Sequence, residues 1–288
     1  MEPELIADYA CVTGEGPLWH PEEQRLYWVD IPPGKIFRYD PATGQHEQCY
    51  QGTEALGGFT FQEDGALLLF GARGAVSILR DGDVTTVIPE IAAEADGRFN
   101  DVIAAPGGRV FCGTMPTDTH AGRLYRLDPD GTLTTLLEGV TISNGLGFTP
   151  DRRGLYHTDT SKKTITLFDF DAATGAIGNG RLFLDLNGKG EEGMPDGMTV
   201  DAEGCVWSAR WDGGVLVRYA PDGSELLRVT FPARKVSSAV FGGPDYADLY
   251  VTTAGGHDKA SNGPGSGALF RLRPGVRGVP EFRSRIGI

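Results

Sequence analysis

The chain has 288 residues, 40% of them hydrophobic and 23% charged, with 39 acidic side chains against 26 basic ones and a net charge of −13. This balance is ordinary for a soluble globular protein, and it argues against nucleic acid or an anionic membrane surface as the main partner. No run of about 18 apolar residues is present, so no membrane span is expected.

The cysteines and the first residues of the chain indicate the cellular compartment in which the protein is expected. The four cysteines lie far apart and form no C-x-x-C pair, which indicates reduced thiols and neither a disulfide framework nor a zinc knuckle. The chain starts with Met1-Glu2-Pro3-Glu4, which is acidic and is not followed by an apolar segment of the signal-peptide kind. We therefore expect no signal peptide and a cytoplasmic protein.

Short apolar runs separated by turn residues follow one another along the chain. Leu5-Ile6-Ala7-Asp8-Tyr9 comes first, and six similar units follow, each with a strand, a turn rich in Gly, Pro or Asp, and a second strand. The first positions of the six units are Glu15, Gly57, Asn100, Asn144, Asp196 and Ser237. They stand 41 to 52 residues apart, and the longest unit carries a glycine- and charge-rich insertion at 187–192, which we expect to be a loop. The last unit runs to Ile288.

Six units with a period of about 40 residues indicate a β-propeller with one four-stranded sheet per blade. We therefore predict an all-β fold, a six-bladed β-propeller with four-stranded antiparallel blades, as a single domain over residues 1–288. The strand at 5–9 is expected to complete the last blade, which would leave no long free sheet edge. Trp19, Trp28 and Trp207 are expected in the blade cores, and Trp211 at the channel mouth.

In a propeller the first strand of each blade lines the central channel, so the six first positions should converge on the axis. Glu15, Asn100, Asn144 and Asp196 carry carboxylate or amide oxygens, and Ser237 adds a hydroxyl. Such oxygens are hard ligands that suit Ca²⁺, Mg²⁺ or Mn²⁺. Two carboxylates in a narrow channel repel each other unless a cation lies between them. Each residue alone is also a common turn residue, but the shared register predicts one divalent metal site.

The motifs around these positions resemble the senescence-marker-protein/gluconolactonase family, which includes regucalcin and the sugar-acid lactonases. The matching pieces are Gly14-Glu15-Gly16-Pro17-Leu18-Trp19, Arg98-Phe99-Asn100-Asp101, Gly113-Thr114-Met115, Ser143-Asn144-Gly145-Leu146, Pro195-Asp196-Gly197-Met198 and Phe241-Gly242-Gly243-Pro244-Asp245. The resemblance implies a six-bladed propeller with one metal held by Glu15, Asn144 and Asp196, and substrate binding by Arg98 and Asn100. It does not identify the ion, so Ca²⁺, Zn²⁺, Mn²⁺, Mg²⁺ and Fe²⁺ all stay open.

The resemblance also implies a reaction, the metal-dependent hydrolysis of a small-molecule sugar lactone such as gluconolactone or xylonolactone. Three protein ligands leave coordination positions open for the lactone carbonyl and a water. Asp196 is the candidate general base, and Arg98 is the candidate to hold sugar hydroxyls or the developing carboxylate. Some relatives place an acidic substrate contact near Met115, and here Asp118 or His120 is the candidate for that role.

Two alternatives stay open. Related propellers act on non-sugar lactones or phosphotriesters, and a propeller can also be a calcium-binding, regulatory or interaction module, since a fold does not determine a function. We expect a monomer or a weak homo-oligomer. In Tyr156-His157-Thr158-Asp159, His157 is expected to pack between blades, and Asp159 is the better candidate to approach the channel.

Overall fold

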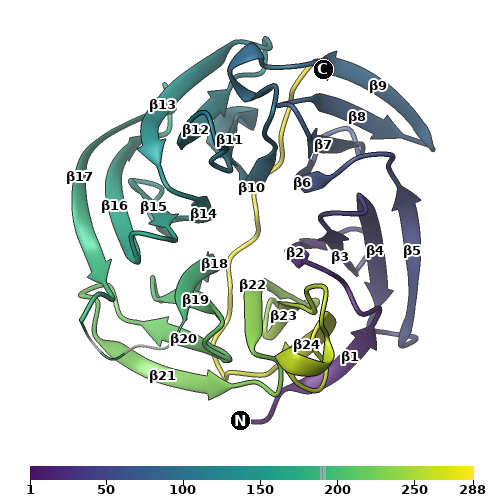
Figure 1. Cartoon of the computed structure of the whole chain (residues 1–288), viewed down its shortest axis with the longest axis vertical. Coiled ribbons are helices and arrows are strands. Elements are labelled where there is room, and N and C mark those ends of the chain that lie inside the picture. Colours follow the sequence, from purple (N-terminus) through teal and green to yellow (C-terminus); the bar gives the residue numbers. More distant parts are fainter. Residues whose placement is uncertain (189, 191–192) are drawn as a thin grey trace.

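The structure is a computed structural model of the chain, and it describes residues 1–188, 190 and 193–288. Within these residues the chain forms six four-stranded antiparallel sheets, arranged as blades in a ring around a central channel (Figure 1). This is the six-bladed β-propeller that the repeat predicts. The insertion expected to form a loop at 187–192 contains Lys189, Glu191 and Glu192, which lie outside the described residues.

The strands follow the chain, four to a blade. Blade 1 consists of β2 (Gly14–His20), β3 (Arg25–Asp30), β4 (Lys35–Asp40) and β5 (Gln45–Gln51). Blade 2 consists of β6 (Leu56–Phe61), β7 (Leu67–Gly71), β8 (Val76–Arg80) and β9 (Asp83–Ile88). Blade 3 consists of β10 (Phe99–Ala104), β11 (Val110–Thr114), β12 (Gly122–Leu127) and β13 (Leu133–Val140).

The second half of the ring repeats this order. Blade 4 consists of β14 (Ser143–Phe148), β15 (Gly154–Asp159), β16 (Thr164–Asp171) and β17 (Ala176–Asp185). Blade 5 consists of β18 (Met194–Val200), β19 (Val206–Trp211), β20 (Val215–Tyr219) and β21 (Glu225–Thr230). Blade 6 consists of β22 (Lys235–Gly242), β23 (Asp248–Ala254), β24 (Ala268–Leu272) and β1 (Glu4–Asp8). Three short 3₁₀ helices are described: η1 (Ala92–Glu94), η2 (Pro106–Gly108) and η3 (Ala260–Asn262), and none of the described helices is long and apolar enough to cross a membrane.

The ring is closed by the N-terminal strand, as expected. β1 pairs antiparallel with β24, with Leu5 opposite Phe270 and Asp8 opposite Ala268. Blade 6 is therefore built from both ends of the repeat region, and the closure satisfies the hydrogen-bonding edge that β24 would otherwise expose.

The hydrophobic core is divided into six clusters, and each cluster joins two neighbouring blades. Trp19 and Trp28 of blade 1 pack against Tyr250 of blade 6, and Trp207 of blade 5 packs against Phe241 of blade 6. All three tryptophans are at most 3% exposed, which confirms their expected place in the core. Because the inner strands bury both faces between blades, the ring holds the start of each inner strand at a defined place around the channel.

The segment after Leu272 differs from the expectation that the last unit runs to Ile288. Residues 277–286, here called the strap, leave blade 6 and cross the middle of the ring, as the yellow segment in Figure 1 shows. At one end Ala202 N donates to Arg277 O at 2.8 Å, and at the other Ser284 N donates to Phe61 O at 2.9 Å. The strap therefore joins blade 5 to blade 2 at the end of the channel where the inner strands finish. It lies outside the repeat, so the period could not predict it.

Candidate metal centre

A cavity of about 290 Å³ opens at the end of the channel where the inner strands begin. Its lining comes from blades 1, 3, 4 and 5 and consists of Thr13, Glu15, Ile31, Arg98, Asn100, Met115, Ile142, Asn144, Thr160, Met194, Asp196 and Trp211. The structure thus brings together Glu15, Arg98, Asn100, Asn144 and Asp196, and it places Trp211 at this mouth as expected. The first positions of blades 2 and 6, Gly57 and Ser237, are not among the described lining residues.

Each inner strand changes register against its neighbour close to the position that faces the channel. The shift begins at Glu15 in blade 1, at Asn144 in blade 4 and at Pro195 in blade 5. A β-bulge of this kind leaves one residue unpaired and re-aims a side chain. The bulges therefore explain how side chains from separate strands reach a common cavity.

Glycine follows each of the three predicted ligands, and local geometry gives the reason. Gly16 has a φ of +51°, a region that L side chains rarely adopt. A Cβ at Gly145 would lie 2.5 Å from the carbonyl oxygen of Asp196, and one at Gly197 would overlap the Ser238 side chain. An oxygen-bearing residue followed by glycine is therefore a second sequence signal of these positions, beside their place in the repeat.

The predicted ligands are buried, and two of them are hydrogen-bonded to each other. Glu15, Asn144 and Asp196 are 8%, 4% and 4% exposed. Asn144 Nδ2 donates to Asp196 Oδ1 and, at 3.3 Å, to Thr160 Oγ1. Glu15 Oε2 accepts a hydrogen bond from Gly16 N at 3.0 Å. Side chains from blades 4 and 5 are thus in direct contact, with the blade 1 carboxylate lining the same cavity.

The charges at this mouth are poorly compensated. Burial raises the pKa of Glu15 well above its ordinary value, and the Asp196 and Asp101 carboxylates raise it further. Burial and Asp101 also raise the pKa of Asp196, while the hydrogen bond from Asn144 and the Arg98 guanidinium act in the opposite direction. Burial lowers the pKa of Arg98, although both carboxylates favour its charged form. A cation between the two carboxylates would remove their mutual repulsion.

The donor set fits a hard divalent cation. Within the described residues no group of three His, Cys, Asp or Glu side chains could hold a metal, so a third ligand beside Glu15 and Asp196 has to be of another kind, and Asn144 offers an amide oxygen. Glu15, Asp196 and Asn144 offer only oxygen donors of the carboxylate and amide kind, which Ca²⁺, Mg²⁺ and Mn²⁺ prefer.

Arg98 and Asn100 are held in place by a chain of hydrogen bonds. Arg98 Nη1 donates to Phe99 O at 2.8 Å and to Asn100 Oδ1 at 2.9 Å. Asn100 Nδ2 in turn donates to Ser143 O of blade 4 at 3.0 Å. No other hydrogen bond of the Arg98 guanidinium is found among the described residues, so its remaining N–H groups can donate into the cavity.

Comparison with known proteins decides the family. The family model described as "SMP-30/Gluconolactonase/LRE-like region" matches residues 13–255. The chain belongs to the SMP-30/gluconolactonase family. The resemblance inferred from the motifs is therefore confirmed.

Two relatives and one solved structure align with this family member over almost its whole length. It is 51% identical to pentonolactonase XacC of Haloferax volcanii, over 98% of this chain and 97% of that protein. It is 35% identical to 6-deoxy-6-sulfogluconolactonase of Pseudomonas putida, over 96% of this chain and 97% of that protein. A solved structure described as a calcium-binding protein, regucalcin, from Agrobacterium tumefaciens superposes with a TM-score of 0.90 at 28% identity, over 99% of this chain and 97% of that one.

In this SMP-30 family member, two of the strands that carry predicted metal ligands are held by the same kind of hydrogen bond. Asp30, at the end of β3, accepts from the backbone N–H groups of Val12 and Thr13 at 3.2 and 2.9 Å, just before Glu15. Asp159, at the end of β15, accepts from Thr141 N at 3.1 Å, just before Asn144. Asp159 therefore supports the loop that leads into β14 and is not among the described cavity-lining residues, unlike the expectation for it.

His157 lies behind the mouth and is 4% exposed, as its expected packing role requires. Its Nε2 is 2.9 Å from Ser143 Oγ, and Ser143 is the residue whose carbonyl accepts from Asn100. Burial lowers the pKa of His157 to about 4, so the ring is neutral at neutral pH. Its role is to hold the β14 segment beside Asn100, and the repeat alone did not predict this contact.

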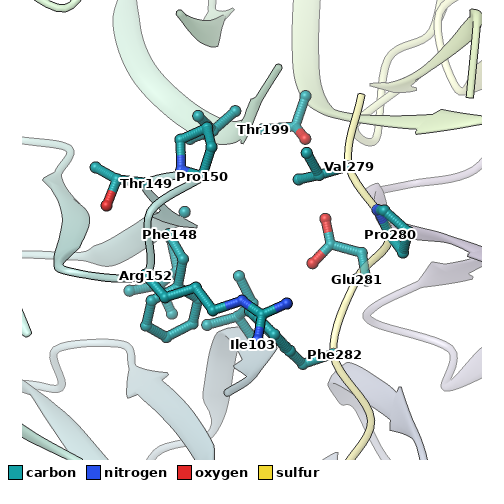
Figure 2. A pocket seen from close by; sticks show the side chains of 13 residues that line it. Ile103, Phe148, Thr149, Pro150, Arg152, Thr199, Val279, Pro280, Glu281 and Phe282 are labelled. Atoms are coloured by element: carbon teal, nitrogen blue, oxygen red, sulfur yellow. The ribbon is translucent and has the colours of Figure 1, made fainter. Parts of the chain in front are cut away.

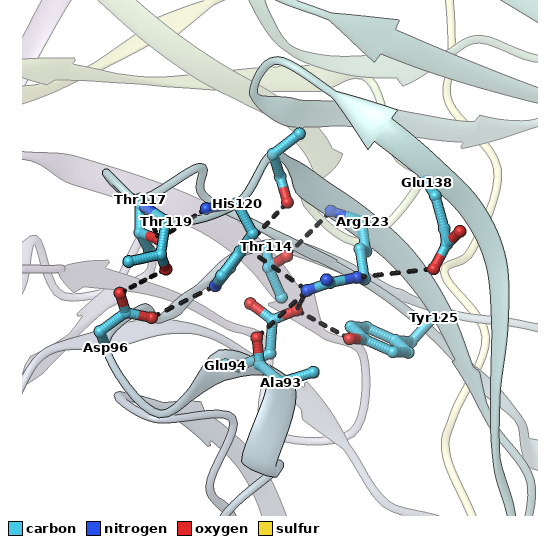
Figure 3. Close-up of polar contacts among 11 residues, drawn as sticks. Ala93, Glu94, Asp96, Thr114, Thr117, Thr119, His120, Arg123, Tyr125 and Glu138 are labelled. Atoms are coloured by element: carbon cyan, nitrogen blue, oxygen red, sulfur yellow. Dashed lines mark hydrogen bonds and ion pairs between the residues drawn. The ribbon is translucent and has the colours of Figure 1, made fainter.

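Figure 3 shows the segment that the resemblance suggests for a further substrate contact, with Thr119 and His120 turned toward Asp96. His120 Nε2 lies 3.3 Å from Asp96 Oδ1, and its Nδ1 lies 2.9 Å from Ala121 O. Asp118 is exposed, and neither it nor His120 is among the described lining residues, whereas Met115 is. Substrate binding by Asp118 or His120 stays a prediction.

The same region contains a buried polar cluster that the repeat pattern does not predict. The Glu94 carboxylate is fully buried, and its Oε1 accepts from Arg123 Nη1 and from Tyr125 OH, both at 2.7 Å. Figure 3 shows Arg123 between Glu94 and Glu138, with the His120 ring beside its guanidinium. Glu94 comes from η1 and the other two residues from β12, so only the fold brings them together.

Proposed function

We propose that this protein is a divalent-metal-dependent lactonase that opens a sugar lactone to the sugar acid. The observation that carries the proposal is the meeting of Glu15, Asn144 and Asp196, from three different blades, beside Arg98 and Asn100 in one open cavity. Two relatives named as sugar lactonases, at 51% and 35% identity over nearly the whole chain, support the reaction class.

In this proposal Glu15, Asn144 and Asp196 hold the cation through three oxygen donors. A divalent cation there would polarise the lactone carbonyl and lower the pKa of a bound water. Ca²⁺, Mg²⁺ or Mn²⁺ fits the oxygen-only donor set better than a metal that prefers nitrogen or sulfur ligands. The similarity to the calcium-binding regucalcin structure makes Ca²⁺ the first ion to test.

The protein's own side chains would supply positioning and proton transfer. Asp196 accepts the proton of the attacking water and returns it to the ring oxygen that leaves as a hydroxyl. Arg98 donates to the sugar hydroxyls and to the carboxylate as it forms, which concentrates its effect in the transition state. Asn100, oriented by Ser143 O and Arg98, contributes a second polar contact. Met115, Ile142 and Trp211 supply apolar surface to the same cavity.

An aldonolactone is the substrate class to test first, with xylonolactone ahead of gluconolactone because of the pentonolactonase relative. The protein is treated exhaustively with a chelator and assayed by proton release, and single divalent ions are then added back. We expect the rate to fall to the uncatalysed level and to return with Ca²⁺, Mg²⁺ or Mn²⁺.

The same assay separates the alternatives. An unchanged rate of hydrolysis after chelation would show that catalysis does not require a metal. Preferential turnover of aryl esters, non-sugar lactones or phosphotriesters would replace the sugar-lactone assignment. Tight calcium binding with no hydrolysis of any of these compounds would indicate a calcium-binding or regulatory propeller instead.

A further inference from the structure

The second end of the channel is closed by the strap, which is fixed on both sides. Gly278 N donates to Tyr246 O of blade 6 at 2.9 Å, and Arg285 N donates to Gly108 O of blade 3 at 2.9 Å. Ile286 N donates to the side chain of Gln62 at 2.8 Å. Between these anchors, residues 279–282 form one wall of a second cavity.

This second cavity, here called the far pocket, has a volume of about 290 Å³ (Figure 2). It is lined by Ile103, Leu146, Gly147, Phe148, Thr149, Pro150, Arg152, Thr199, Val200, Val279, Pro280, Glu281 and Phe282. Most of these side chains are apolar, the hydroxyls come from Thr149 and Thr199, and the two charged groups are Arg152 and Glu281. A pocket of this size, at the lower end of the range for ligand sites, takes a small molecule.

The carboxylate of Glu281 points into the far pocket, as Figure 2 shows. It makes no hydrogen bond or ion pair within the part of the chain that the structure describes. Burial raises the pKa of Glu281 to about 7, and the Asp101 carboxylate adds to the rise. An unpaired carboxylate among apolar side chains is costly, so a partner that donates hydrogen bonds and carries positive charge would be favoured there.

Arg152 stands at the rim of the same pocket and is exposed to solvent. Its guanidinium lies 5.2 Å from the centre of the Phe282 ring, a cation–π contact that holds it beside the strap. Among the described residues it forms no ion pair, with Glu281 or with any other acid. A positive group at the rim and a negative group inside are therefore both available to a ligand, separated by more than the 4.0 Å limit for an ion pair.

We propose that the far pocket binds a small zwitterion, an α-amino acid with an apolar side chain. Its ammonium group would bind the Glu281 carboxylate, its carboxylate would bind the Arg152 guanidinium, and its side chain would lie against Phe148, Val200 and Val279. Complementary charge decides between ligands here: a simple cation would face repulsion from Arg152, and an acid would face repulsion from Glu281. The site lies at the opposite end of the channel from the candidate metal centre and does not depend on the lactonase proposal.

The test is calorimetric titration of the whole 288-residue chain with L-leucine, isopentylamine and 4-methylpentanoate. The last two ligands keep the apolar body of leucine but lack its carboxylate or its ammonium group. We expect leucine to bind. The affinity of each single-charge analogue should be lower by about tenfold or more, since the free energy of a hydrogen bond to a charged group corresponds to at least that factor.

Variants on the strap and on the rim sharpen the test. Glu281→Gln and Arg152→Gln, made separately, should each weaken leucine binding by about tenfold or more. Arg153→Gln is the matched control, because Arg153 is an exposed neighbour that does not line the far pocket, and it should bind leucine as the unaltered protein does. The melting curve of each variant confirms that it is folded.

Three results would overturn the proposal. One is that leucine does not bind to the unaltered protein at any leucine concentration up to the solubility of leucine. Another is unchanged leucine affinity in both folded variants, which would place the ligand elsewhere. The third is isopentylamine binding as tightly as leucine, which would make the far pocket a site for amines alone.

Discussion

The two ends of the central channel are built from different parts of the chain. At the open end, Glu15, Asn144 and Asp196 come from equivalent positions of the repeat and line one cavity. At the other end, Glu281 comes from the strap, which is outside the repeat and crosses the mouth between blades 5 and 2. Burial raises the pKa of Glu15 at the open end and of Glu281 at the other end.

The difference lies in how the charge is arranged. The open end collects two carboxylates and an amide around one point, with Arg98 beside them, which is a geometry for a cation and a polar substrate. The closed end presents one carboxylate inside an apolar wall and one guanidinium at the rim, so substitutions there should alter stability or ligand binding and leave hydrolysis intact. Asp101 lines the channel together with Gly16 and Glu281, and it raises the pKa of Asp196 at one end and of Glu281 at the other.

The largest effect is expected at the open end, from Asp196→Ala. Loss of a cation ligand that also serves as the base should lower kcat/KM for the preferred lactone by about 1,000-fold or more. The measurement is initial rates at saturating divalent cation, with folding checked by circular dichroism. Asp130→Ala, at an exposed turn, is the control and should keep full activity. Full activity in a folded Asp196→Ala protein would exclude Asp196 from the mechanism.

A smaller effect is expected on stability, through His157, which supports the open end from behind. The unfolded chain takes up a proton on His157 near pH 6.5, whereas the folded protein does so only near pH 4. The stability contributed by the neutral, buried ring is therefore complete above about pH 6.5 and is lost as the pH falls toward about 4, by up to about 3 kcal/mol.

Urea unfolding at several pH values between these limits measures the loss. His157→Gln should flatten the pH dependence, while Ser143→Ala, which keeps the imidazole buried, should retain it. Identical slopes for His157→Gln and the unaltered protein would show that another group carries the acid sensitivity.

Arg98→Lys tests the substrate side of the open end. Lysine lacks the planar fork with which Arg98 contacts Phe99 O and Asn100 Oδ1 while facing the cavity, so kcat/KM should fall by about 10- to 100-fold. Separate values of kcat and KM, with the cation saturating, show whether the ground state or the transition state is affected. A kcat/KM equal to that of the unaltered protein would mean that Arg98 does not contact the substrate.

The smallest effect is expected at the closed end. Phe282→Ala removes a ring that packs on Phe148 and beneath Arg152, and because the ring is only half-buried the loss should be about 2 kcal/mol of unfolding free energy. Lactone hydrolysis should stay within about twofold, since truncation of a partly buried ring acts locally. Leu226→Ala, at an exposed site, controls for stability. A large drop in kcat with Phe282→Ala would contradict the separation of the two ends.

The sequence by itself determined the propeller, the number of blades and the identity of the inner strands. The repeat predicts these features because each blade is built from the same local contacts. Equivalent positions in the repeat therefore have equivalent places in the ring. It also pointed to Glu15, Asn100, Asn144 and Asp196 as axial residues, and the structure places all four in one cavity. Closure of the ring by the N-terminal strand followed from the same reasoning.

Only the tertiary structure decided which axial positions share a cavity, how the bulges aim them, and where the chain goes after the repeat ends. The strap, the far pocket and the Glu94 cluster depend on contacts between residues that are remote in sequence and follow no period. Asp159 illustrates the limit: alternation along β15 suggested the channel, but a hydrogen bond to Thr141 N holds its carboxylate on the adjoining loop. Such choices depend on which donors the folded chain brings within reach, and local pattern does not contain that information.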